Sequence, residues 1–186
     1  KKGPVPDEFA ITGLGPIFLN VSRLKGMDTM LTEVLLMRKI QTEGKYHLYE
    51  MGTGGNGASV IVKVDTTSVQ GYQGYGGIHH VAFRVNDLKE LEEWRIRLEK
   101  FGAPNSGYVD RFYFGSLYTR LYLNILFEIA TDGPGFIDDE ESYEILGEKL
   151  ALPPKFRNDR EYVEKIVRPI DTVRSTKEFK KEYFND

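Results

Sequence analysis

The sequence predicts an α+β fold made of two β-α-β-β-β modules and a C-terminal helical tail. The first observation is a weak internal repeat, in which residues 13–21 align with residues 77–85 at an offset of 64 positions. The second is that each copy is followed by a helix-like segment and then by three strand-like runs. Two such units side by side would curve a mixed sheet around a cleft, with the helices outside.

The first module is expected over residues 11–70, after a linker at residues 1–10. Apolar residues at helical spacing mark its helix, and strand-like runs follow. The helix residues are Met27, Met30, Leu31 and Val34, and the strands are expected over residues 36–42, 45–51 and 59–64. The run 52–57 spells G-x-G-x-x-G, but a strand follows it where a dinucleotide-binding fingerprint requires a helix. This run therefore predicts a hairpin turn.

The second module is expected over residues 71–136 and the tail over residues 137–186. The helix of the second module is marked by a capping box at Asp87 and Glu90, by an apolar stripe, and by Gly102 at the position where a helix ends. The remaining expected elements are strands over residues 108–114, 117–122 and 125–130, tail helices over about 140–150 and 159–167, and a last helix capped by Ser175 with Glu178.

Two of the three histidines, His79 and His80, stand at the start of the second module's first strand. Side chains alternate between the two faces of a strand, so Val81, Phe83 and Val85 form one apolar face. The other face carries His80, Ala82 and Arg84. Glu128 is a lone carboxylate in an otherwise apolar strand. An imidazole and a carboxylate that meet in a cleft are suited to bind a divalent ion. The alternatives to a metal site are that the two histidines form a hydrogen-bonded pair with a structural role and that Glu128 faces water.

The first module lacks this pair. Pro16 stands at the position that matches His80, and the counterpart of Glu128 falls within residues 60–64. The first module is therefore expected to have the scaffold without the ligands.

The aromatic-rich run 110–120 contains Arg111, Tyr113, Tyr118 and Arg120. Arg stabilises a developing oxyanion and Tyr donates a proton or a hydrogen bond, so the run suits an anionic or phenolic substrate. Ordinary strand packing with an exposed Arg explains the pattern equally well.

Composition excludes several classes of function. The chain has 186 residues, enough for one domain with a real core, and its net charge of −3 gives no basic field for nucleic acid or anionic membrane. No apolar run approaches a membrane span, and the first residues lack the apolar region of a signal peptide. The chain has no cysteine, which removes thiolate chemistry and fits a cytoplasmic protein.

Three segments carry a resemblance to a known superfamily: residues 76–85, 110–114 and 126–136, with residues 146–148 and 152–154 after them. Together with the repeat, they resemble the vicinal oxygen chelate superfamily (glyoxalase/bleomycin resistance/dioxygenase). Within it, the chain is most similar to the C-terminal half of hydroquinone-type ring-cleaving dioxygenases.

The resemblance implies a 2-His-1-carboxylate site that holds Fe(II), or Mn(II), and leaves positions for a small aromatic diol and O2. It implies that His80 and Glu128 are metal ligands and that His79 is a hydrogen-bonding or acid/base group beside the metal. Arg111 and Tyr118 would line the substrate pocket. The family's remaining histidine ligand has no counterpart here, so we expect this chain alone to be inactive until an N-terminal half or a homodimer mate completes the site.

Two further readings remain open. One is a glyoxalase-type isomerase using Ni(II), Co(II) or Zn(II), with the site assembled from two His80/Glu128 pairs across a homodimer in one version. The other is a binding module without catalysis, as in resistance proteins that sequester a drug between two such units.

Overall fold

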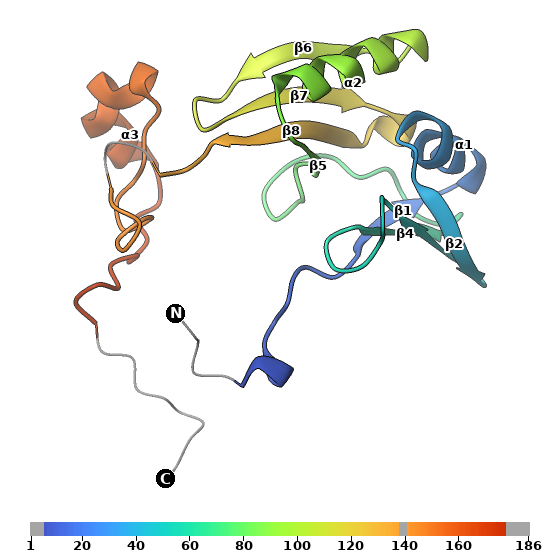
Figure 1. The fold of residues 1–186 in the computed structure, drawn as a ribbon, viewed down its shortest axis with the longest axis horizontal. Coiled ribbons are helices and arrows are strands. Elements are labelled where there is room, and N and C mark those ends of the chain that lie inside the picture. The colour runs from blue at the N-terminus through green and yellow to red at the C-terminus, as the bar shows by residue number, and fades with distance from the viewer. Residues whose placement is uncertain (1–5, 138–140, 178–186) are drawn as a thin grey trace.

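The computed structural model describes residues 6–137 and 141–177, and it contains two β-α-β-β-β modules, as the sequence predicts (Figure 1). The first module consists of β1 (Ile17–Val21), α1 (Leu24–Thr29), a π-helical turn η2 (Met30–Val34), β2 (Arg38–Glu43), β3 (Tyr46–Glu50) and β4 (Ser59–Val64). The second consists of β5 (Val81–Val85), α2 (Leu88–Lys100), β6 (Asn105–Asp110), β7 (Phe114–Arg120), a 3₁₀ turn η3 (Tyr122–Asn124) and β8 (Leu126–Pro134). Outside the modules lie η1 (Asp7–Phe9), η4 (Pro154–Asp159) and the short helix α3 (Arg160–Ile166).

Each module forms its own mixed four-stranded sheet, so the single mixed sheet suggested by the sequence is in fact two. The strand orders are β1-β4-β3-β2 and β5-β8-β7-β6. In each, the first strand pairs in parallel with the last, and the other neighbours are antiparallel. The helical crossover after the first strand provides the long connection that a parallel arrangement requires.

The internal repeat is confirmed at the level of register. Strands β1 and β5 start 64 residues apart, at Ile17 and Val81. Phe18 pairs with Ile61 in the first sheet, and Ala82 pairs with Glu128 in the second. Ile61 is therefore the structural counterpart of Glu128, within the range 60–64 that the sequence indicated.

Helix α2 begins and ends where the sequence predicts. The Asp87 carboxylate accepts a hydrogen bond from the Glu90 backbone N–H at 2.8 Å. The Glu90 side chain accepts a hydrogen bond from the backbone N–H of Asn86. In a standard capping box it would accept from the N-cap residue, which is Asp87 here. Gly102 follows the helix with a φ of +67°, a conformation that glycine adopts without strain.

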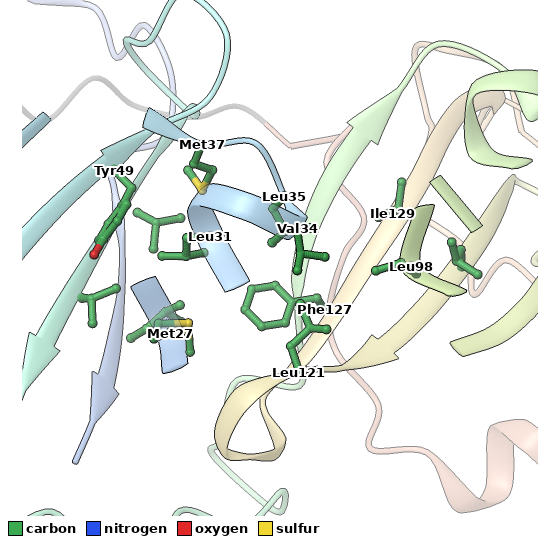
Figure 2. Close-up of a cluster of buried hydrophobic side chains, with 14 of the residues drawn as sticks. Met27, Leu31, Val34, Leu35, Met37, Tyr49, Leu98, Leu121, Phe127 and Ile129 are labelled. Atoms are coloured by element: carbon green, nitrogen blue, oxygen red, sulfur yellow. The ribbon is translucent and has the colours of Figure 1, made fainter. Parts of the chain in front are cut away.

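The two modules share one hydrophobic core, because α1 and η2 of the first pack against the second (Figure 2). Leu31 and Val34 are fully buried on the first side, as are Leu98 and Phe127 on the second. Figure 2 shows Phe127 beside Val34, where the two halves of the core meet. Arg97 of α2 adds a polar link, since its Nε donates to the Val34 carbonyl at 2.7 Å and its Nη2 to the Glu33 carbonyl.

The expected strand limits around residues 111–116 are wrong. Strand β6 ends at Asp110, and β7 already begins at Phe114. Phe112 has a φ of +69° and forms the turn between them, a conformation that sequence pattern does not reveal for a bulky residue.

The tail differs in part from expectation. Residues 141–149 form turns where a helix was expected, and the buried Glu141 side chain accepts from the backbone N–H groups of Gly147 and Lys149, both at 2.7 Å. The expected helix near residues 159–167 is α3. The expected last helix lies largely in residues 178–186, outside the described residues, and Ser175 instead donates to the Glu148 carboxylate at 2.8 Å.

Within residues 6–137 and 141–177, no helix has the length and hydrophobicity needed to cross a bilayer.

Candidate metal centre

The candidate site lies on the face of the second sheet that does not build the core. Phe83 of β5 turns toward the core and stacks on Phe127, with ring centroids 6.2 Å apart. Alternation therefore directs the even-numbered residues of β5 to the opposite face. Register places Glu128 between Ala82 on one neighbouring strand and Tyr118 on the other. The small Ala82 side chain leaves room beside the carboxylate.

His80 and Glu128 form a close pair, as the sequence predicted. The His80 Nε2 atom lies 2.6 Å from Glu128 Oε2. Glu128 is only 3% exposed, and its other oxygen, Oε1, accepts a hydrogen bond from the Ser116 hydroxyl. Each oxygen of the Glu128 carboxylate therefore has one partner, a ring nitrogen or a hydroxyl. Such partners offset the cost of burying a carboxylate.

His79 contacts the far side of the His80 ring. The two Nδ1 atoms are 2.8 Å apart, and the rings meet edge to face with centroids separated by 5.1 Å. One nitrogen of such a pair donates and the other accepts. When His79 accepts, the proton of His80 is held on Nδ1 and its Nε2 lone pair is free for a metal ion.

Arg111 and Tyr118 also meet at this site. Arg111 Nε donates to the Tyr118 hydroxyl at 3.1 Å, and the guanidinium lies 4.9 Å from the centre of the tyrosine ring. The Tyr118 ring in turn lies edge-on to His80, with centroids 6.1 Å apart. All five residues selected from the sequence therefore converge on one patch of the sheet.

The donor set fits a divalent transition metal but is incomplete. Imidazole nitrogen and carboxylate oxygen suit Fe(II), Mn(II) or Zn(II). Their 2.6 Å separation is a hydrogen-bond distance, whereas two ligands on one ion lie about 3 Å apart, so a small outward movement would admit an ion. Among the described residues, no group of three or more His, Asp or Glu side chains is arranged to hold a metal.

A cavity of about 790 Å³ opens at the two histidines, which lie in its wall together with residues of β1 and of the connection between the modules. Arg111, Tyr118 and Glu128 do not line it. Its volume lies within the range of small-molecule sites. A ligand in this cavity would therefore reach the site from the side of His79 and His80.

Sequence reasoning missed Ser116. This residue is completely buried, lies two positions before Tyr118 on the same face of β7, and contacts Glu128 directly. The expected strand break at Gly115 and Ser116 concealed the alternation that links it to Tyr118. A strand drawn from residue 114 onward would have included it.

Comparison with known proteins gives concordant matches. A Bacillus subtilis (strain 168) protein named "Putative ring-cleaving dioxygenase MhqA" is 39% identical over 175 residues, which are 91% of this chain and 55% of that protein. The "Chlorohydroquinone/hydroquinone 1,2-dioxygenase" of Sphingobium indicum is 31% identical over 154 residues, 81% of this chain and 47% of that protein. No protein-family model matches the chain.

Solved structures give the fold. The crystal structure of a "putative dioxygenase" from Bacillus subtilis superposes with a TM-score of 0.81 and 31% identity, covering 93% of this chain and 55% of that one. The chain has the vicinal oxygen chelate fold. The fosfomycin resistance protein FosX of Listeria monocytogenes shares this fold alone, with a TM-score of 0.53, 21% identity and coverage of 66% of this chain and 94% of that one.

The resemblance to the vicinal oxygen chelate superfamily is thus confirmed, and the chain is homologous to proteins named ring-cleaving dioxygenases. It spans about half the length of these relatives, 55% and 47% for the two described.

Proposed function

We propose that this vicinal oxygen chelate chain provides the metal-binding module of a ring-cleaving dioxygenase that acts on hydroquinone-like or catechol-like diols. His80 and Glu128 would hold Fe(II), or alternatively Mn(II), together with a further ligand from outside the described residues. The dioxygenase names of its relatives support this reaction class, and the chlorohydroquinone and hydroquinone of one of those names suggest the substrate class.

The observation that carries the proposal is the buried Glu128 carboxylate, 2.6 Å from His80 Nε2. Burying an unneeded carboxylate in a sheet is costly, and the counterpart position in the first module holds Ile61. A polar pair kept in one module and replaced by apolar residues in the other fits a chemical role better than a structural one.

The chain's own residues would perform distinct tasks. A metal ion, when bound, supplies a Lewis acid that favours the deprotonated diol and brings it into contact with O2. His79 would fix the His80 tautomer through the contact between their Nδ1 atoms. Tyr118 would hydrogen-bond a substrate oxygen, and the Arg111 guanidinium beside it would stabilise negative charge that develops there.

Two protein ligands bind iron weakly, so the active site would need completion. A segment outside this sequence, or a second copy of the chain that brings its own His80 and Glu128, would provide the missing donors. The two routes differ in concentration dependence, because only the second requires self-association.

The test is metal content and oxygen uptake of the chain after anaerobic loading with Fe(II), with chlorohydroquinone and hydroquinone as substrates. Wild-type protein should bind iron and consume O2 with an added diol, either alone or once the completing segment is supplied. His80→Ala and Glu128→Ala should lose both properties. A protein that is fully loaded with iron at this pair and takes up no O2 with either diol would refute the proposal.

His47→Gln is the matched control, because His47 is the third histidine and belongs to the first module. It should leave iron binding and O2 uptake unchanged. Binding of chlorohydroquinone to His80→Ala separates the alternatives: a binding module keeps its ligand affinity after this change. An isomerase would turn over its substrate without O2 and with Ni(II), Co(II) or Zn(II).

A further inference from the structure

The connection that leads into His80 has little stiffness of its own. Residues 71–80 contain four glycines, and Gly76 has a φ of +78°. The large apolar side chains of this connection do not anchor it, because Tyr72, Tyr75 and Ile78 are 86%, 104% and 75% exposed. Glycine-rich backbone without packing samples many conformations, so the position of His80 needs another restraint.

Gln73 provides such a restraint. Its Nε2 donates to the His79 carbonyl at 2.5 Å and closes a loop of the chain immediately before the metal pair. Inside this loop, the Gly77 N–H donates to the Gly74 carbonyl at 3.0 Å. Among the described residues, these two bonds hold the turn that delivers His80 to Glu128.

Arg120, at the end of β7, braces Gln73 from the sheet. Its Nη2 donates to Gln73 Oε1 at 2.9 Å, and its Nη1 donates to the Asn124 carbonyl at 2.9 Å. Arg120 can only donate and the His79 carbonyl can only accept. The amide of Gln73 can therefore satisfy both partners in one orientation only, which gives the link a fixed direction from sheet to loop.

We infer that Gln73, braced by Arg120, is a positioning residue for the metal ligand His80. The inference rests on the proposed metal-binding function. Both side chains also lie in the wall of the cavity at the two histidines. The restraint acts through the backbone of His79, so it sets the direction from which the His80 imidazole approaches Glu128 without contacting the ion or a substrate.

The test uses Mn(II) as the probe, with its affinity for the whole chain measured by water-proton relaxation. Gln73→Ala should weaken Mn(II) binding about tenfold, the lower end of the effect of losing a group that orients a ligand. Arg120→Met should cause a smaller loss, and Arg120→Lys should restore part of it. Thermal melting should show that each variant is as well folded as the wild type, because both side chains lie at the surface.

Gln70→Ala is the matched control. Gln70 has the same side chain, belongs to the same connection and lines the same cavity, yet it makes no side-chain hydrogen bond to the described residues. It should bind Mn(II) like the wild type. Hydrogen exchange of the amides of residues 74–80 should be several-fold faster in Gln73→Ala than in Gln70→Ala, a readout that needs no metal.

His80→Ala separates the two proposals. If His80→Ala loses Mn(II) binding while Gln73→Ala keeps wild-type affinity, the positioning role is wrong and the metal pair stands. If His80→Ala binds Mn(II) as the wild type does, the metal-binding function is wrong, and the positioning of a ligand falls with it. Unchanged hydrogen exchange in Gln73→Ala also overturns the positioning role.

Discussion

The two modules have the same topology and strand register but differ in their chemistry. In the first, Phe18 pairs with Ile61 and Leu48 pairs with Ile61 from the other side. In the second, Glu128 takes the place of Ile61 between its two neighbouring strands. Alternate residues of these strands build the shared core in both modules, so the residues between them are free to change. One face of each sheet therefore specifies the fold, and the other can acquire a site.

The difference also shows what a carboxylate in a sheet requires. Glu128 has Ser116 and His80 as partners, whereas the counterpart of Ser116 is the more exposed Tyr46 and the counterpart of His80 is Pro16. A buried carboxylate without donors costs several kcal/mol, roughly 3–5 when one partner of a buried pair is removed. The second module thus has a matched set of polar residues, and the first has none of its members.

The largest expected effect is on metal binding, when Glu128 is replaced by isoleucine, the residue at the matching position of the first module. Glu128→Ile should weaken binding of Mn(II) or Fe(II) on the order of 100-fold or more, since one of the two proposed ligands is lost. The measurement is metal stoichiometry after equilibrium dialysis. Ser116→Ala, which keeps both proposed ligands, should show a clearly smaller loss. Equal metal binding by Glu128→Ile and the wild type would remove the chemical distinction between the modules.

The next effect concerns the core that the modules share. Phe127 and its first-module counterpart Val60 are 0% and 3% exposed. Phe127→Ala should lower the free energy of unfolding by about 3–5 kcal/mol, and Val60→Ala by roughly 1–2.5 kcal/mol, because the cavity and the lost apolar area are larger for Phe. Urea unfolding measures both. Equal losses would show that the two positions contribute equally to the free energy of unfolding.

The polar link between the modules should have an intermediate effect. Arg97→Met removes the bonds to the Val34 and Glu33 carbonyls but keeps apolar contact with Phe101, whose ring the guanidinium overlies at 5.1 Å. We expect a loss of about 1–3 kcal/mol in the free energy of unfolding. Lys100→Met is the surface control and should change the free energy of unfolding by less than about 0.5 kcal/mol. Comparable melting temperatures for the two variants would show that the link is not stabilising.

The smallest effect is a pH dependence specific to the first module. Burial lowers the pKa of His47 below its ordinary value of 6.5, and Lys39 lowers it further, while Asp28 opposes the shift. The unfolded chain then binds the proton more tightly than the folded one, so stability is present above pH 6.5 and is lost as the pH falls below it.

The second-module counterpart of His47 is Leu117, judged from the pairing of each with the strand beside it. His47→Leu should therefore reduce the fall in melting temperature between neutral pH and pH 5, and it should leave stability at pH 8 within about 1 kcal/mol. Thermal melts of both proteins across this range provide the measurement. An unchanged pH profile would show that His47 is not the group responsible.

Much of the fold could be predicted because local patterns specify it. Apolar alternation marked β4 and β5, and the cap at Asp87 with Gly102 defined α2. The errors fall where nonlocal contacts decide the conformation. The positive φ of Phe112 shifted two strand limits, and the buried Glu141 carboxylate bound backbone N–H groups that a helix would have used differently.

The site could be predicted only as a set of residues on one face. Strand alternation placed His80 and Glu128 away from the core, and both belong to the pair that the structure contains. Ser116 and Gln73 escaped notice because their roles depend on partners 12 and 6 residues distant in sequence, as the Ser116–Glu128 and Gln73–His79 bonds show. Arg120 was selected only as a residue that could bind a substrate, and its bond to Gln73, 47 residues away, was not foreseen. No short-range periodicity reports such pairs.

By itself the sequence determined the two-module architecture, the faces of the strands and the candidate ligands, since side-chain period and helix caps are properties of neighbouring residues. The tertiary structure decided which of those groups meet. Parallel pairing of β5 with β8 brings His80 within 2.6 Å of Glu128 across 48 residues of chain, and antiparallel pairing of β7 with β8 adds Ser116 and Tyr118. Hydrogen-bond register between strands depends on residues far apart in the chain, so local sequence patterns do not reveal these distances.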